Sequence, residues 1–255
     1  MQKFVAYTNR KPSNIVVNLS TPRKSKIRIR AIDPSKRGAM YMDREATVDG
    51  RKQFEIRLPQ SPEKLLIKVA AARGGAVKVD SVKEANLPRY MNCISGKKVA
   101  SFLKFAMEFS ENAGILATGR YVSDNKKYII DYLPEIVHES GKVLSTPARI
   151  SNSTGRMEIS KKAFSKMTIP MRMAILCHEF SHFYLNEVQR DEIEADLNAL
   201  TLYLGLGYPI IEAHKAFLET FESTPTKMNK ERYIYLKTFI DNFDKLKHKI
   251  CSITP

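Results

Sequence analysis

The chain has 255 residues, of which 43% are hydrophobic and 27% are charged, as is typical of a folded globular protein and not of a disordered one. No apolar run approaches the roughly 18 to 20 residues that a membrane-spanning helix needs, and the first residues lack the apolar core of a signal peptide. The sequence therefore argues against a helical membrane protein and predicts a protein of the cytoplasm.

Positive charge is concentrated in the first part of the chain. The formal net charge is +15, and residues 1–98 contain 22 Lys and Arg against 8 Asp and Glu, whereas residues 99–255 contain 20 against 19. A basic surface of this kind favours an acidic partner, either nucleic acid or the acidic face of another protein. The alternative is a well-solvated, strand-rich surface, since no DNA- or RNA-binding motif accompanies the charge.

The cysteines argue against a disulfide framework. Cys93, Cys177 and Cys251 are an odd number without CxxC spacing, which favours a reducing compartment and makes a thiolate zinc site improbable. Cys177 precedes His178, but its neighbours form a small apolar run, so core packing is the better interpretation.

The first part of the chain alternates short strand patterns with turn formers. Asp49-Gly50 predicts a hairpin turn and Gly74-Gly75 another turn. This regular spacing predicts a β-sandwich-like module over residues 1–90. The expected strands span residues 14–19, 26–32, 39–42, 53–58, 64–70 and 76–82.

Residues 91–255 show the order of an α+β domain. After a connector over residues 86–98, apolar residues at spacings of three and four predict a helix over 99–113. Pro170 is accepted in the first turn of a long helix that runs to about Tyr184. The remaining expected elements are strands over 127–133, 148–151 and 156–160, a turn over 152–155, and covering helices over 210–221 and 231–250.

The long helix carries His178-Glu179-Phe180-Ser181-His182, an HExxH motif. Two histidines four residues apart project from one helical face, so two neutral imidazoles can bind one Zn²⁺ while the intervening glutamate faces water held at the metal. HExxH alone is a moderate signal. The acidic stretch that follows it strengthens the prediction of a metal site.

Glu192 and Asp196 are four residues apart and share one helical face. One of them can bind a metal while the other accepts a hydrogen bond from an imidazole N–H. Asp191 and Glu194 are alternative third ligands. Glu194 lies about 200° around a helix from Glu192, so these two cannot both face the metal.

HExxH followed by Glu192-Ile193-Glu194-Ala195-Asp196 resembles the zincin metallopeptidases, and in particular the gluzincin branch with its downstream ExxAD. The resemblance covers residues 95–220, with its motifs in residues 178–196. It implies His178, His182 and Glu192 as zinc ligands, Glu179 as general base and Asp196 as the partner of a ligand histidine. It also implies that the strand over 156–160 is the edge on which an extended substrate lies.

The leading hypothesis is a zinc metallopeptidase that hydrolyses peptide bonds in a peptide or protein substrate. His214 and Tyr208 are the candidate donors for the developing oxyanion. A second hypothesis is a structural subunit of a large assembly such as a phage virion, with a zinc site of little or no catalytic use and other assembly subunits as partners. A third makes the basic module a nucleic-acid adaptor. The expected location is accordingly a bacterial or host cytoplasm, or a virion.

Overall fold

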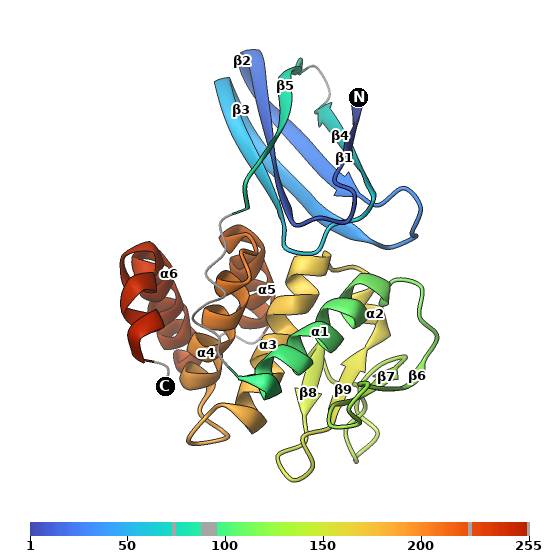
Figure 1. The fold of residues 1–255 in the computed structure, drawn as a ribbon, viewed down its shortest axis with the longest axis vertical. Helices are drawn as coiled ribbons and strands as arrows, with labels where there is room; N and C mark the ends of the chain where they lie inside the picture. The colour runs from blue at the N-terminus through green and yellow to red at the C-terminus, as the bar shows by residue number, and fades with distance from the viewer. Residues whose placement is uncertain (73–74, 88–95, 224–225, 254–255) are drawn as a thin grey trace. The chain divides into compact units, whose positions relative to one another are not determined.

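A computed structural model describes residues 1–72, 75–87, 96–223 and 226–253, and the chain divides into two compact units (Figure 1). The first unit comprises Met1–Pro88 with Gly207–Pro209, and the second comprises Arg89–Leu206 with Ile210–Pro255. The described residues form two β-sheets and six helices, which is the predicted mixed α+β class. None of the helices in these ranges has the length and apolar character needed to cross a membrane.

The first unit is built on one five-stranded antiparallel sheet. The strand order is β1-β4-β2-β3, and β5 pairs with the first part of β2. Alternate residues of β2, from Ile15 to Leu19 and again from Ile27 to Ala31, are buried, so the sheet has one apolar face. The strands are β1 (Gln2–Tyr7), β2 (Ser13–Ile32), β3 (Met40–Leu58), β4 (Lys64–Ala71) and β5 (Lys78–Ala85).

Two long strands replace four predicted short ones. The predicted strands over 14–19 and 26–32 are parts of β2, and those over 39–42 and 53–58 are parts of β3. The hairpin predicted at Asp49-Gly50 is wrong, because Gly50 lies inside β3 opposite Thr21, with a φ of 71°, where the register of the two strands shifts. The extra residues lie in β2, between Thr21 and Ser25, and β3 continues through Gly50 without ending. Strand β1 was not predicted.

Two further predictions for this unit have no complete test. Gly74 lies outside the described residues, while the N–H of Gly75 donates to the carbonyl of Ala72 at 2.9 Å. The two-layer, sandwich-like arrangement of the module stays a prediction.

The sheet of the second unit has the order β6-β7-β9-β8. Strands β7 and β9 are parallel, and the other two pairings are antiparallel. Strand β9 is therefore paired on both edges, which corrects the prediction that the strand over 156–160 is the free edge. The outer strands of this sheet are β6 and β8, and β8 is the one that contacts α3. Strand β6 was not predicted. The strands are β6 (Gly119–Val122), β7 (Ile129–Leu133), β8 (Ala148–Ile150) and β9 (Met157–Ser160).

Helix α3 is the centre of the second unit and contacts α1, α4, α5 and β8 (Figure 1). It begins after Thr168, whose hydroxyl accepts a hydrogen bond from the N–H of Met171, and it contains Pro170 in its first turn, as predicted. Phe102 of α1 stacks on Phe180 with ring centroids 3.9 Å apart. The helices are α1 (Lys97–Asn112), α2 (Lys161–Phe164), α3 (Ile169–Tyr184), α4 (Glu192–Gly205), α5 (Ile210–Ser223) and α6 (Lys227–Ile253).

A buried arginine joins three of these helices. Arg172 of α3 donates from Nε to the carbonyl of Phe164 at 2.8 Å and from Nη1 to the carbonyl of Ser110 at 2.7 Å. Burial lowers the pKa of Arg172 to about 10. The guanidinium thus satisfies carbonyls near the ends of α1 and α2 that have no donor inside those short helices.

We expect Arg172→Met to lower the free energy of unfolding by about 2 to 4 kcal/mol, because the buried carbonyl of Ser110 loses the guanidinium and that of Phe164 keeps only the N–H of Met167. Urea denaturation followed by circular dichroism measures the change. Lys166→Met, at an exposed position, is the control and should change stability by less than about 0.5 kcal/mol. Equal stability of the two variants would show that the arginine contributes nothing to holding these helices together.

Candidate metal centre

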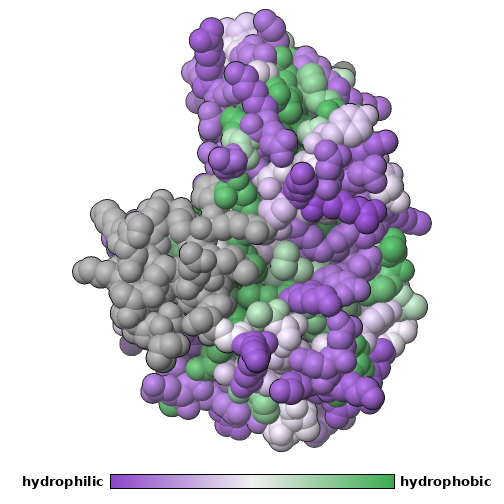
Figure 2. Space-filling view, viewed as in Figure 1, coloured by the Kyte–Doolittle hydropathy of each residue, from purple (hydrophilic) through white to green (hydrophobic). Residues whose placement is uncertain are grey.

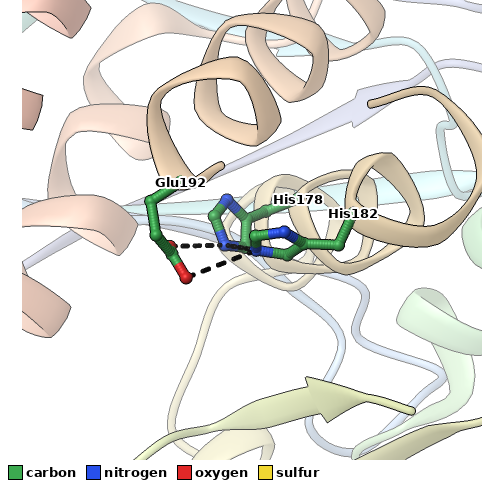
Figure 3. Close-up of side chains that lie close together, drawn as sticks. All are labelled: His178, His182 and Glu192. Atoms are coloured by element: carbon green, nitrogen blue, oxygen red, sulfur yellow. Dashed lines mark hydrogen bonds and ion pairs between the residues drawn. The ribbon is translucent and has the colours of Figure 1, made fainter. Parts of the chain in front are cut away.

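Three side chains from consecutive helices converge at one point (Figure 3). His178 and His182 lie one turn apart on α3, with their Nε2 atoms 3.0 Å apart. Glu192 is the first residue of α4, which begins after Asp191 caps it by accepting the N–H groups of Ile193 and Glu194. The short connection between α3 and α4 therefore reverses the direction of the chain, so that Glu192 points at both histidines.

The donor atoms of the three side chains, one from each residue, lie within 4.8 Å of one another, close enough to share one metal ion. Glu192 Oε2 lies 3.5 Å from His178 Nε2, and Glu192 Oε1 lies 3.6 Å from His182 Nε2. Bonds of about 2.0 to 2.1 Å at a tetrahedral zinc ion place neighbouring ligand atoms about 3.3 Å apart. Two imidazoles and one carboxylate are also a ligand set that zinc takes, so these residues fit the predicted metal.

The other nitrogen of each imidazole is already engaged. His182 Nδ1 lies 2.7 Å from the carbonyl oxygen of Gln189, which only accepts, so Nδ1 carries the proton. His178 Nδ1 lies 2.9 Å from Asp196 Oδ1, within the buried interior. With the protons held on Nδ1, both Nε2 lone pairs face the point where Glu192 arrives.

Arg232 of α6 completes this group, and the sequence did not reveal it. Its Nε and Nη2 donate to the two carboxylate oxygens of Asp196 at 2.8 and 3.0 Å, and its Nη1 lies 3.0 Å from Glu192 Oε2. The signal was available in the pattern of α6. Arg232 lies one turn before Leu236 and two turns before Ile240, and all three are buried.

Carboxylates and burial set the charges of the cluster. Burial opposes charge on His178, but the hydrogen bonds to Asp196 and Glu192 outweigh it and raise the pKa of His178 to about 10. Burial also opposes charge on Glu192, yet His178 and Arg232 lower the pKa of this carboxyl to about 2. The surroundings that favour a second proton, on Nε2 of His178, would also favour a metal cation, which takes the place of that proton.

Glu179 differs from the other carboxylates. It is buried, and burial raises its pKa to about 7, against the opposing effect of His178. A backbone hydrogen bond from Ile150, in the edge strand β8, also reaches this carboxylate. A carboxyl group that gains and loses a proton near neutral pH is suited to general base and acid chemistry.

A cavity of about 580 Å³ opens over the cluster. Strand β8 and the residues flanking it line the cavity, together with His178, Glu179, His182 and Glu192. Arg190 and Arg232 also line it. The size is within the usual range for a small-molecule or peptide subsite.

The other predicted candidates lie elsewhere. Asp191 caps α4, and the carboxylate of Glu194 accepts the N–H of Glu187 at 2.9 Å, so the structure brings neither to the histidines. Tyr208 is buried and His214 is half-buried on α5, and neither is among the residues that line the cavity. Burial lowers the pKa of His214, whose charged neighbours Asp241 and Lys237 lie on α6.

Cys177 is a buried core residue, as expected. Burial raises the pKa of its thiol to about 12, which removes the thiolate needed for nucleophilic chemistry.

Comparison of the chain with protein-family models, with curated proteins and with solved structures finds no match.

Proposed function

We propose that the second unit is a zinc-dependent metallopeptidase of the gluzincin type. The observation that carries the proposal is the convergence of His178, His182 and Glu192, with donor atoms within 4.8 Å of one another, at a cavity that Glu179 also lines. The order of HExxH helix and ExxAD helix, which resembles the gluzincins, supports the same assignment.

The arrangement around the site supports a zincin-like fold. The mixed sheet β6-β7-β9-β8 packs with α1 and α3, and the metal-binding helix α3 is followed directly by the glutamate-bearing helix α4. Phe109 of α1 packs edge-on against Tyr132 of β7, with ring centroids 5.3 Å apart, which places α1 against the sheet. This layering brings the edge strand, the metal helix and the glutamate helix to one cavity.

His178, His182 and Glu192 would hold the zinc ion, and zinc supplies Lewis-acid polarisation of a carbonyl and a lowered pKa of water. Glu179 takes a proton from the attacking water and delivers it to the leaving amine. Arg232 lines the cavity beside Glu192, where its ion pairs with Asp196 and Glu192 hold it, and its positive charge stabilises the negative charge that develops on the carbonyl oxygen. It takes the role first predicted for His214 and Tyr208.

The substrate is a peptide in extended conformation. Among the described strands, β8 pairs only with β9 and so is an outer strand of its sheet, and its Ala148 and Ile150 line the cavity. A peptide that adds to this edge forms main-chain hydrogen bonds and crosses the floor of the cavity. The substrate edge is thus β8, one strand away from the one that the sequence indicated.

The alternative of a structural subunit in an assembly such as a virion predicts a closed zinc site. The cavity over the ligand atoms favours catalysis instead.

For the basic first unit an acidic partner remains a proposal. Hydrophilic residues dominate its visible surface (Figure 2), but Lys26 pairs with Glu45 and Arg28 with Asp43, so part of this charge is neutralised within the sheet.

The test compares two glutamates of the same helix. We expect the wild-type protein to bind one zinc ion and to cleave members of a peptide library, with cleavage abolished by a chelator and restored by zinc. Glu192→Gln should weaken zinc binding by more than about 100-fold, because a charged ligand is lost. Glu194→Gln is the matched control, since its amide oxygen can still accept the shorter of the two loop hydrogen bonds, from the N–H of Glu187, and zinc affinity should not change.

Isothermal titration calorimetry with zinc, and mass spectrometry of the peptide library, give the two readouts. Equal zinc affinity of the two variants would overturn the ligand assignment. Zinc bound at one equivalent without cleavage of any library member would favour the structural subunit.

A further inference from the structure

Arg190 is a cation at the cavity, and no described residue forms an ion pair with it. The residue lines the cavity and is exposed. Within the part of the chain that the structure describes, no carboxylate pairs with it. The two other arginines of the cavity are engaged, because Arg149 donates to Glu158 at 2.6 Å and Arg232 holds Asp196 and Glu192.

The backbone that carries Arg190 is held on both sides. The carbonyl of the preceding residue, Gln189, accepts from the metal-site residue His182 at 2.7 Å. The next residue, Asp191, caps α4, and its N–H donates to the carbonyl of Val188 at 2.8 Å. The position of Arg190 relative to the ligand atoms is therefore set by the same contacts that form the site.

The acidic groups of the cavity are already committed. Glu192 contacts both histidines and Arg232, and Glu179 lies buried beside His178 with a hydrogen bond from Ile150. Of the charged side chains that line the cavity, Arg190 is thus the one that can pair with an entering ligand. A guanidinium presents parallel N–H groups whose spacing matches the two oxygens of a carboxylate.

We propose that Arg190 binds a carboxylate of the peptide held in this cavity and so selects acidic substrates. The carboxylate is either the side chain of Asp or Glu near the scissile bond or the free α-carboxylate of a chain end. This inference rests on the proposed peptidase function. Arg190 is a specificity-determining residue and takes no part in the proton transfers.

Three fluorescent heptapeptide pools with the same random flanking positions test it. The first has Glu at the central position and an amidated C-terminus, the second has Gln and an amidated C-terminus, and the third has Gln and a free C-terminal carboxylate. Cleavage rates are measured with the wild type, and equilibrium binding is measured by fluorescence anisotropy with zinc-loaded Glu179→Gln protein. The binding arm does not require hydrolysis.

We expect the wild type to prefer the first or the third pool over the second by about 10-fold, the magnitude of one charge-assisted hydrogen-bonded pair. Arg190→Gln should abolish this preference, and Arg190→Lys should retain part of it. Lys166→Gln removes the same charge at an exposed position away from the cavity and should leave the preference unchanged. Preference for the first pool identifies a side-chain carboxylate, and preference for the third identifies a chain end.

An equal preference in the wild type and in Arg190→Gln overturns the proposal. Failure of the peptidase function has a different signature, because all pools then stay uncleaved while the anisotropy arm still reports whether Arg190 discriminates between them.

Discussion

Replacing Glu179 with Gln is expected to leave one zinc ion bound and to lower the rate of peptide hydrolysis by about 10²- to 10⁴-fold, the usual contribution of a general base. Gln has nearly the same shape as Glu, and its amide oxygen still accepts the backbone hydrogen bond from Ile150. It cannot take a proton from water. The three ligand side chains are untouched by the change.

The rate is measured with the peptide pool that the wild type cleaves best, and bound zinc is measured by mass spectrometry of the native protein. Glu139→Gln, at an exposed position, removes the same charge from the same unit and should keep the wild-type rate. An unchanged rate in Glu179→Gln would mean that another group is the base. Loss of zinc from this variant would instead make Glu179 part of the metal site.

Arg232→Met is expected to lower the free energy of unfolding by about 3 to 5 kcal/mol, the range for removing one partner of a buried ion pair. Asp196 is 1% exposed and would keep its charge without the two hydrogen bonds from the guanidinium. Because Asp196 also orients His178, we expect zinc affinity to fall by about 10- to 100-fold. Chemical denaturation and zinc titration measure the two effects.

A double variant separates the cost of the unpaired charge from lost packing. Asp196→Asn added to Arg232→Met removes the uncompensated carboxylate. The double variant should therefore recover part of the stability that Arg232→Met loses. Lys237→Met, on the exposed face of the same helix, should stay within about 0.5 kcal/mol of the wild type. A loss below about 1 kcal/mol in Arg232→Met would show that Asp196 does not depend on this arginine.

Local signals predicted the fold where structure depends on near neighbours. The start of α3 follows from Pro170 and its apolar run, and both ends of that helix agree with the prediction. The predicted strands of the first unit are shorter than the observed ones, because Gly50 and the region of Thr21 have the sequence of turns. Only the pairing of β2 with β3 along their whole length shows that these residues form a register shift within continuous strands.

The sequence by itself determined the candidate ligands, because helical periodicity alone puts His178 next to His182 and Glu192 next to Asp196. Tertiary structure decided everything that depends on distant segments. It chose Glu192 over Asp191 and Glu194 through the capped start of α4, it placed β8 and not β9 at the sheet edge, and it brought Arg232 to Asp196 from 36 residues away. Side-chain spacing along one helix is a local property of the backbone, whereas the partners of a buried charge and the free edge of a sheet are set by how separate elements pack.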